Sequence, residues 1–185
     1  FSKFSGRQEE AHQINAACEA YRDEVSSEAA QYDMSDYVDL LLAVMMQESS
    51  GQGTDPMQSS EGAYNTRYPQ QPNGITDPSY SISCGIQELK YALDKAGCTG
   101  PTDLSKIRLA LQAYNFGADS YFAYLEENGQ TVWTAQSAQA FAQMASGGTQ
   151  RDEDDPLHDP AGPWDYGDQY YPDHVLRYYH LDNNS

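Results

Sequence analysis

An apolar segment that ends on an acidic residue constrains this chain more than any other feature. Residues 40–46, LLLAVMM, form the longest uninterrupted apolar run. The stretch 37–47 is apolar on nearly all sides of a helix, which is typical of a central, buried helix because a surface helix keeps a polar face. Glu48 follows, and glycines at 51 and 53 indicate where the helix ends. We therefore expect a buried helix with the carboxylate of Glu48 near its C-terminal end.

The remaining sequence predicts further helices and no convincing pair of strands. The spacing of apolar residues supports these helices, and caps and terminal glycines support two of them. Two stretches rich in Gly and Pro predict loops, an irregular one at 62–80 and an exposed one at 147–163. We expect one mainly α domain over residues 1–185. The expected helices are 9–31, one capped by Ser81 or Ser83 and closed by Gly97, one capped by Asp103 or Ser105 and stopped by Gly117, 118–127, 134–145 and 172–180.

Charge and cysteine content exclude several kinds of function. Ten Lys and Arg against twenty-eight Asp and Glu give a formal net charge of -18, so we expect no binding to nucleic acid or to an anionic membrane surface. The longest apolar run is far shorter than the roughly 20 residues that span a bilayer. Three cysteines without metal-ligand spacing predict neither a disulfide framework nor a zinc site. A helix between Cys84 and Cys98 would hold them roughly 20 Å apart, so we expect no bridge between them.

The position of Glu48 has a chemical consequence. Burial and the negative end of the helix dipole both disfavour the charged form of a carboxyl group, so we expect Glu48 to hold its proton more strongly than an exposed glutamate. An acid of this kind can protonate the leaving oxygen of a glycosidic bond near neutral pH. The alternative is a frayed helix end with Glu48 in water, and position alone favours this alternative.

Three separated motifs favour the interpretation of Glu48 as a proton-donating acid. QESSG at 47–51, GIQ at 85–87 and AYNFG at 113–117 resemble, in the same order, the signature of the lysozyme-like superfamily of goose-type lysozymes and soluble lytic transglycosylases. A longer pattern, MMQESSGQGTDPMQSSE, SISCGIQ, ALQAYNFG and YGDQYYPDHVLRYY, is similar to the lysozyme-like muramidase domain of conjugative elements and Gram-positive surface proteins. The chain departs from that pattern at Cys84 and in an acidic stretch at 150–159, and neither departure removes a catalytic group.

The resemblance implies a fold and an activity. The implied fold is a lysozyme-like domain with a substrate cleft beside the buried central helix. The implied activity is hydrolysis of the β-1,4 bond between N-acetylmuramic acid and N-acetylglucosamine in peptidoglycan, with Glu48 as general acid and Asp55 as second catalytic carboxylate. Whether the configuration of the sugar is retained or inverted stays open, because the sequence does not fix the distance between the two carboxylates.

Each proposed residue also has a structural interpretation. Asp55 precedes Pro56, and an Asp-Pro pair commonly starts a turn in which the side chain bonds backbone N–H groups. Glu61 either assists in the cleft or pairs with Arg67 or caps a turn. Ser81 either contacts sugar or caps its helix.

The candidates in the second and third motifs have similar alternatives. Gln87 offers an amide that can donate to and accept from sugar groups, or it is an ordinary residue of a first helical turn. Tyr114 and Asn115 lie on a core-facing helix. The motif places the Tyr114 hydroxyl near Glu48 or the substrate, whereas the structural interpretation is a buried Tyr whose hydroxyl is hydrogen-bonded. Tyrosines 64, 68 and 80 can stack on sugar rings or pack their loop.

The complete expectation is a monomeric, secreted or cell-surface bacterial enzyme that acts on peptidoglycan glycan strands without a cofactor or metal. Because the sequence begins at Phe1 rather than Met, we expect that an upstream segment has been removed. Two alternatives remain: a lytic transglycosylase, which cuts the same bond without water and leaves anhydro-muramic ends, and a peptidoglycan-binding module without catalysis.

Overall fold

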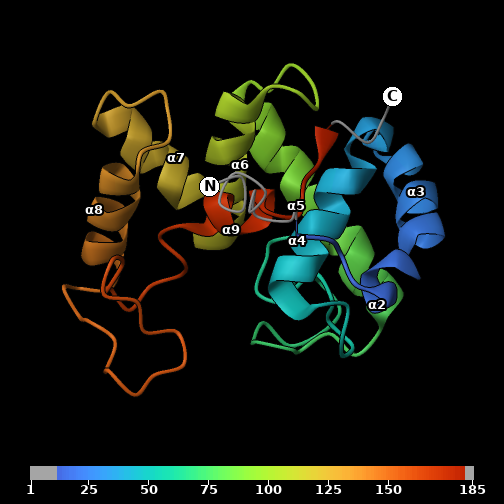
Figure 1. Ribbon diagram of the computed structural model, residues 1–185, viewed down its shortest axis with the longest axis horizontal. Coiled ribbons are helices and arrows are strands. Elements are labelled where there is room, and N and C mark those ends of the chain that lie inside the picture. The colour runs from blue at the N-terminus through green and yellow to red at the C-terminus, as the bar shows by residue number, and fades with distance from the viewer. Residues whose placement is uncertain (1–11, 182–185) are drawn as a thin grey trace, which may run out of the picture. The chain divides into compact units, whose positions relative to one another are not determined.

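The computed structural model describes residues 12–181, and its regular elements are helices (Figure 1). Within this range the only β pairing is an isolated bridge between Gln150 and Trp164, so the mainly α prediction is confirmed. Positions 1–11 and 182–185 of the expected domain lie outside the described residues. The elements are α2 (Ala16–Glu19), α3 (Arg22–Gln31), η1 (Ser35–Tyr37), α4 (Val38–Ser49), α5 (Pro78–Ala96), α6 (Leu104–Phe116), α7 (Ala118–Glu127), α8 (Ala135–Ala145) and α9 (Tyr171–Leu176).

The chain divides into two compact units, which we describe separately. The first comprises the described residues up to Ile86 together with those from His174 onward, and the second comprises Gln87–Asp173. Helices α5 and α9 each contribute to both units. No helix within residues 12–181 has the length and apolar character needed to cross a membrane.

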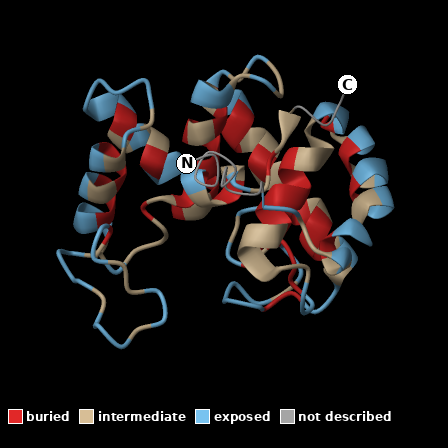
Figure 2. Ribbon diagram, viewed as in Figure 1, coloured by how far each residue is buried: buried red, intermediate tan, exposed pale blue. Residues whose placement is uncertain are grey.

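Helix α4 forms the core of the first unit. Six consecutive side chains, Leu40 to Met45, are each 0% exposed, and α4 packs against α2, α3 and η1. In Figure 2 its ribbon is coloured as buried through the middle and as intermediate toward its C-terminal end. The prediction of a buried helix over 37–47 that ends near Gly51 is confirmed.

The predicted helix over 9–31 is wrong in its continuity, and its first residues lie outside the described range. Asn15 caps α2, because its side chain accepts a hydrogen bond from the N–H of Cys18 at 2.9 Å, and the chain turns at Ala20 and Tyr21 before α3. The two helices are attached to α4 at different places. The Asn15 amide donates to the carbonyl of Ser50 at the end of α4, whereas Arg22 at the start of α3 pairs with Asp39 at 2.8 Å.

Helix α5 begins earlier than either predicted cap. Its first residue is Pro78, which suits the first position of a helix because proline lacks the N–H that would have no partner there. The side chain of Asp77 accepts a hydrogen bond from the N–H of Ser79 at 3.0 Å. Ser81 and Ser83 therefore lie inside the helix, and the predicted loop over 62–80 ends at Asp77. The predicted close at Gly97 is confirmed, since α5 ends at Ala96 and Gly97 has a φ of +73°.

In the second unit the sequence predicted the helices closely. Asp103 caps α6 by accepting from the N–H of Lys106, and Thr134 caps α8 by accepting from the N–H of Ser137. Gly117, with a φ of +98°, separates α6 from α7, and these two helices pack together. The core contains an aromatic cluster in which Phe116, Tyr121 and Phe141 contact one another at ring-centroid distances of 5.0 to 5.5 Å. The last predicted helix, 172–180, is shorter in the structure because α9 ends at Leu176.

The cysteines differ in accessibility, and no disulfide joins them. Cys18 and Cys84 are 0% and 1% exposed, whereas Cys98 is half-buried. Burial, and secondarily the charge of Glu19, raises the pKa of the Cys18 thiol to about 11. At pH 8 the reactive thiolate of such a group amounts to roughly one part in a thousand, since each pH unit below the pKa lowers it tenfold.

We therefore predict one rapidly reacting thiol in the native protein at pH 8 and three after denaturation, measured with a chromogenic disulfide reagent. Replacing Cys98 with serine should remove the rapid phase and leave two thiols that react only in denaturant. A rapid phase of two or three thiols in the folded protein would contradict this distribution of burial.

Candidate active site

Glu48 lies one residue before the end of α4 and is half-buried. Ser50 adopts a left-handed conformation with a φ of +56° and closes the helix, its N–H bonded to the carbonyl of Met46. Both sequence neighbours of Glu48 are held by side-chain bonds. The Gln47 amide oxygen accepts from the Arg177 guanidinium at 3.1 Å, and the Ser49 hydroxyl donates to the carbonyl of Pro56 at 2.7 Å.

The close approach of Gly51 to α2 fixes the path of the chain as it leaves α4. Gly51 has a φ of +75°, and a Cβ there would lie 2.9 Å from the backbone nitrogen of Cys18. A side chain at this position would be strained and would clash. The loop that follows, residues 51–77, hangs from the lower end of α4 in Figure 1.

Asp55 is a buried carboxylate inside this loop, 1% exposed. Its Oδ1 accepts from the N–H of Ser59 at 3.1 Å and from the hydroxyl of Ser81 at 2.7 Å. Its Oδ2 accepts from the N–H of Ser60 at 3.3 Å and from the hydroxyl of the same serine. Four donors thus surround the two oxygens and offset the loss of hydration that burial of a carboxylate causes.

Ser81 connects the loop to α5 and is itself 0% exposed. Besides donating to Asp55, its hydroxyl accepts from the N–H of Met57 at 3.1 Å, and its carbonyl accepts from the hydroxyl of Ser59 at 2.9 Å. One turn later a Cβ at Gly85 would lie 2.6 Å from the Cβ of Met57. The glycine of the second motif therefore lies where helix and loop are in close contact.

Glu61, the other acidic candidate of the loop, is exposed and directly follows Ser60. Within residues 12–181 no ion pair joins it to Arg67, whose guanidinium lies instead over the ring of Tyr80 at 4.8 Å. The Tyr80 hydroxyl accepts from the N–H of Thr66 and donates to the carbonyl of Tyr64. In this structure the hydroxyl of Tyr80 holds the loop together.

Sequence reasoning missed Asn65, which is 3% exposed and central to the same loop. Its amide donates to the carbonyls of Ser60 and Tyr68 at 2.7 and 3.0 Å, and its oxygen accepts from the N–H groups of Arg67 and Tyr68. An Asn inside a stretch rich in Gly and Pro is a signal for such local bonding, but it does not identify the partners.

The third motif lies in the second unit, on α6. Tyr114 is 7% exposed and stacks on Tyr171 with ring centroids 6.5 Å apart. The Asn115 side-chain oxygen accepts from the N–H of Asp168 at 2.7 Å. Gln87, from the second motif, is half-buried on α5 in the same unit. The first unit holds Glu48, Asp55, Glu61 and Ser81, and the second holds Gln87, Tyr114 and Asn115.

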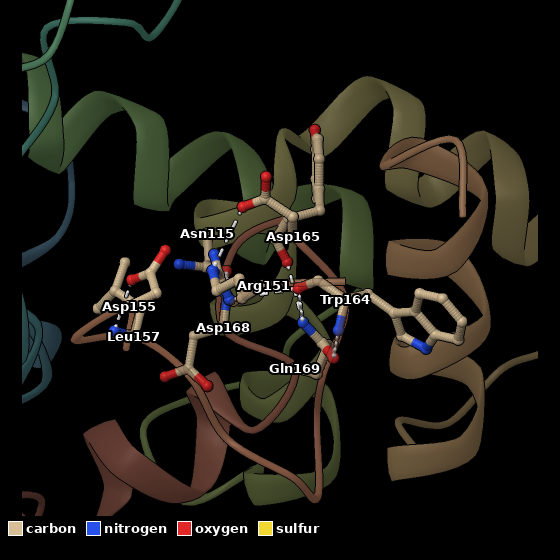
Figure 3. A network of polar contacts seen from close by, with 9 residues as sticks. Asn115, Arg151, Asp155, Leu157, Trp164, Asp165, Asp168 and Gln169 are labelled. Atoms are coloured by element: carbon tan, nitrogen blue, oxygen red, sulfur yellow. Dashed lines mark hydrogen bonds and ion pairs between the residues drawn. The ribbon is translucent and has the colours of Figure 1, made fainter. Parts of the chain in front are cut away.

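The segment YGDQYY, residues 166–171, makes contacts with the third motif that the sequence did not predict. Figure 3 shows Asn115 directed at Asp168 within a wider polar network. Gln112 on α6 donates to the carbonyl of Asp168 at 2.9 Å, and Gly167, with a φ of +54°, lies so close that a Cβ would be 2.5 Å from the Asn115 oxygen. The Asn of the third motif therefore anchors this segment to α6.

Arg151, at the start of the acidic stretch, is a buried cation that contacts residues 164 and 165. The Arg151 side chain is 8% exposed and lies 3.4 Å from the carboxylate of Asp165, and it also donates to the carbonyl of Trp164 at 3.3 Å. Gln169 donates to that same carbonyl (Figure 3). Within residues 12–181 no group of three or more His, Cys, Asp or Glu side chains could hold a metal ion.

Comparison with known proteins identifies the family. A family model described as lysozyme-like matches residues 16–179. The chain belongs to the lysozyme-like family. This confirms the resemblance that the three motifs indicated and places all seven candidate site residues inside the matched region.

Several relatives of this lysozyme-like chain are known. It is 35% identical over 160 residues to the bifunctional muramidase/DL-endopeptidase CwlT of Bacillus subtilis strain 168, covering 86% of this chain and 41% of CwlT. It is 37% identical over 110 residues to a pneumococcal vaccine antigen A homolog of Streptococcus pyogenes, covering 60% of this chain and 50% of that protein. The crystal structure of a protein similar to a lipoprotein of the NLP/P60 family from Staphylococcus aureus superposes with a TM-score of 0.75 at 28% identity, covering 91% of this chain and 54% of that one. The chain thus spans about half the length of these relatives or less.

The contact between Gly85 and Met57 generates a stability prediction. Glycine inside a helix costs about 1 kcal/mol relative to alanine, but an added Cβ would overpack the loop, which typically costs about 1 to 3 kcal/mol. We predict that Gly85→Ala lowers the free energy of unfolding in urea, whereas Gly100→Ala, where an added Cβ meets nothing within 4 Å, does not. A Gly85→Ala protein more stable than wild type would show that helix and loop are not in this close contact.

Proposed function

We propose that the chain is a peptidoglycan hydrolase of the N-acetylmuramidase type, which cleaves the β-1,4 bond between N-acetylmuramic acid and N-acetylglucosamine. The observation that carries this proposal is Glu48, a half-buried carboxyl group near the end of the buried helix α4. The lysozyme-like family and the similarity to CwlT over 86% of the chain support the substrate class.

Glu48 acts as general acid in this proposal. The leaving glycosidic oxygen needs a proton as its bond to the anomeric carbon breaks, and a carboxylic acid in a partly desolvated site can supply it near neutral pH. The Ser49 hydroxyl ties the C-terminal side of Glu48 to the carbonyl of Pro56, and the Gln47 side chain on the other side bonds Arg177. Such fixed positioning favours proton transfer, because small misplacements of reacting groups lower rates strongly.

The other motif residues have proposed roles in binding or support. Gln87, Tyr114 and Asn115 supply amide and hydroxyl groups that can bond sugar substituents. Glu61 is the exposed carboxylate of the loop and is a candidate to orient the attacking water. We propose that Ser81 supports the loop instead of touching sugar, because its side chain is fully buried.

One observation favours a second candidate function. Both oxygens of Asp55, the expected second carboxylate, are occupied by donors from the protein. A lytic transglycosylase needs one acid only, because the 6-hydroxyl of the muramic acid itself attacks the anomeric carbon. A peptidoglycan-binding module without catalysis has no such support, since Glu48 and its positioning contacts are present.

We place the enzyme at the bacterial cell surface or outside the cell, where its proposed substrate lies. The net charge of -18 gives no electrostatic attraction to the anionic polymers that many bacterial walls carry, and at low salt it favours repulsion. Binding to glycan strands must therefore come from short-range contacts.

We predict that Glu48→Gln abolishes the lysis of purified cell walls. The amide preserves the shape of the side chain but cannot donate a proton to the leaving group, and general acid catalysis typically contributes about 10²- to 10⁴-fold to the rate. Loss of turbidity of a wall suspension measures lysis, and circular dichroism confirms that the variant is folded.

Asp94→Asn provides a matched control. Asp94 is exposed, and the change removes one carboxylate from a surface ion pair with Lys90. It should lyse walls like the wild type. A folded Glu48→Gln protein that stays within a few-fold of wild-type activity would refute the assignment of Glu48.

A further inference from the structure

The carboxylate of Asp55 is enclosed by the loop that it belongs to. Its exposed fraction is 1%, and each oxygen accepts from one backbone N–H and one serine hydroxyl. A nucleophile or a base has to approach its reaction partner to about 3 to 3.5 Å. The enclosed oxygens of Asp55 are unsuited to that approach as long as the loop keeps this conformation.

A short chain of bonds leads from Asp55 to Glu48. Asp55 is followed by Pro56, whose carbonyl accepts from the hydroxyl of Ser49 at 2.7 Å. The same hydroxyl accepts from the N–H of Gly51 at 3.0 Å. Ser49 is the residue after Glu48, so the Pro56 carbonyl is one of the groups that hold the end of α4.

On its other side Asp55 is fixed to α5. The Ser81 hydroxyl donates to it at 2.7 Å and accepts from the N–H of Met57, and Ser59 donates to the carbonyl of Ser81. All these atoms belong to the first unit. The first and second sequence motifs are therefore joined through Asp55.

We infer that Asp55 is a positioning residue, which holds Glu48 in place through the connected contacts Ser81–Asp55, Asp55–Pro56 and Pro56–Ser49, and that its carboxylate does not touch the glycan. The inference rests on the proposed function for the identity of the reaction. It assigns Ser49 of the QESSG motif and Ser81 of SISCGIQ to the same set of contacts.

The test compares variants of the residues that make these contacts with a variant of a residue that does not take part in them. Asp55→Asn replaces an acceptor with an amide that cannot satisfy donors on both sides. Ser81→Ala and Ser49→Ala each remove one hydroxyl and leave the carboxylate of Asp55 in place. They therefore remain informative if Asp55→Asn fails to fold. Ser79→Ala is the matched control, because Ser79 is exposed in the same helix.

The kinetic measurement uses soluble glycan fragments of peptidoglycan, at temperatures well below the unfolding midpoint of every variant. We expect Asp55→Asn, Ser81→Ala and Ser49→Ala each to lower kcat by about tenfold or more, as misplaced catalytic groups do. Ser79→Ala should keep the wild-type kcat. Sodium azide should not restore activity to Asp55→Ala, because no reacting carboxylate has been removed.

Two results would overturn the inference. One is restoration of Asp55→Ala by azide with formation of a glycosyl azide, which identifies a reacting carboxylate. The other is wild-type kcat in the folded Ser81→Ala and Ser49→Ala proteins, which would reduce the network to a purely structural role.

A readout without substrate separates this inference from the proposed function. Hydrogen–deuterium exchange of the amides of residues 46–50 should be faster in Ser81→Ala than in wild type and unchanged in Ser79→Ala. Unchanged exchange at these amides in Ser81→Ala would refute the connection between Ser81 and the Glu48 helix end. An inactive wild type or an active Glu48→Gln protein would instead refute the muramidase proposal alone.

Discussion

The buried carboxylate of Asp55 is the interaction on which the loop of the first unit depends. A buried carboxylate is stable only when its oxygens are hydrogen-bonded, and Asp55 meets this condition with donors from Ser59, Ser60 and Ser81. Each donor left without its acceptor would cost about 1 to 3 kcal/mol. The requirement therefore fixes the path of the loop, brings its Met57 onto Gly85 of α5 and delivers the Pro56 carbonyl to Ser49.

A loop without strands needs such side-chain bonding throughout. Buried N–H and C=O groups must find partners, and in residues 51–77 many of them are side chains, including Asn65, Thr54 and Ser60. In the second unit, the side chains of Asn115 and Gln112 likewise bond the backbone of Asp168. In both units a motif residue fixes an irregular segment against a helix, and the proposed chemistry relies on that rigidity.

The helices with strong periodicity and local caps were predictable from the sequence, whereas long-range attachments were not. Asp103, Thr134 and Gly117 act within one turn of their own helices, so a local pattern reports them. The division of α2 from α3 has no Gly or Pro signal, because it reflects attachments of Asn15 to Ser50 and of Arg22 to Asp39. The motifs predicted Glu48, Asp55 and Asn115 as candidate site residues, but only the structure shows what the last two contact.

The central proposal is that the chain cuts the glycan strand by hydrolysis, and the chemical nature of the products tests it most directly. Purified peptidoglycan is digested with the wild-type chain, and the released fragments are analysed by mass spectrometry before and after reduction with borohydride. Hydrolysis between the two sugars leaves reducing N-acetylmuramic acid ends, which gain two hydrogens on reduction, and this is the predicted result. Fragments that end in anhydro-muramic acid and resist reduction would contradict the account and assign the chain to the lytic transglycosylases.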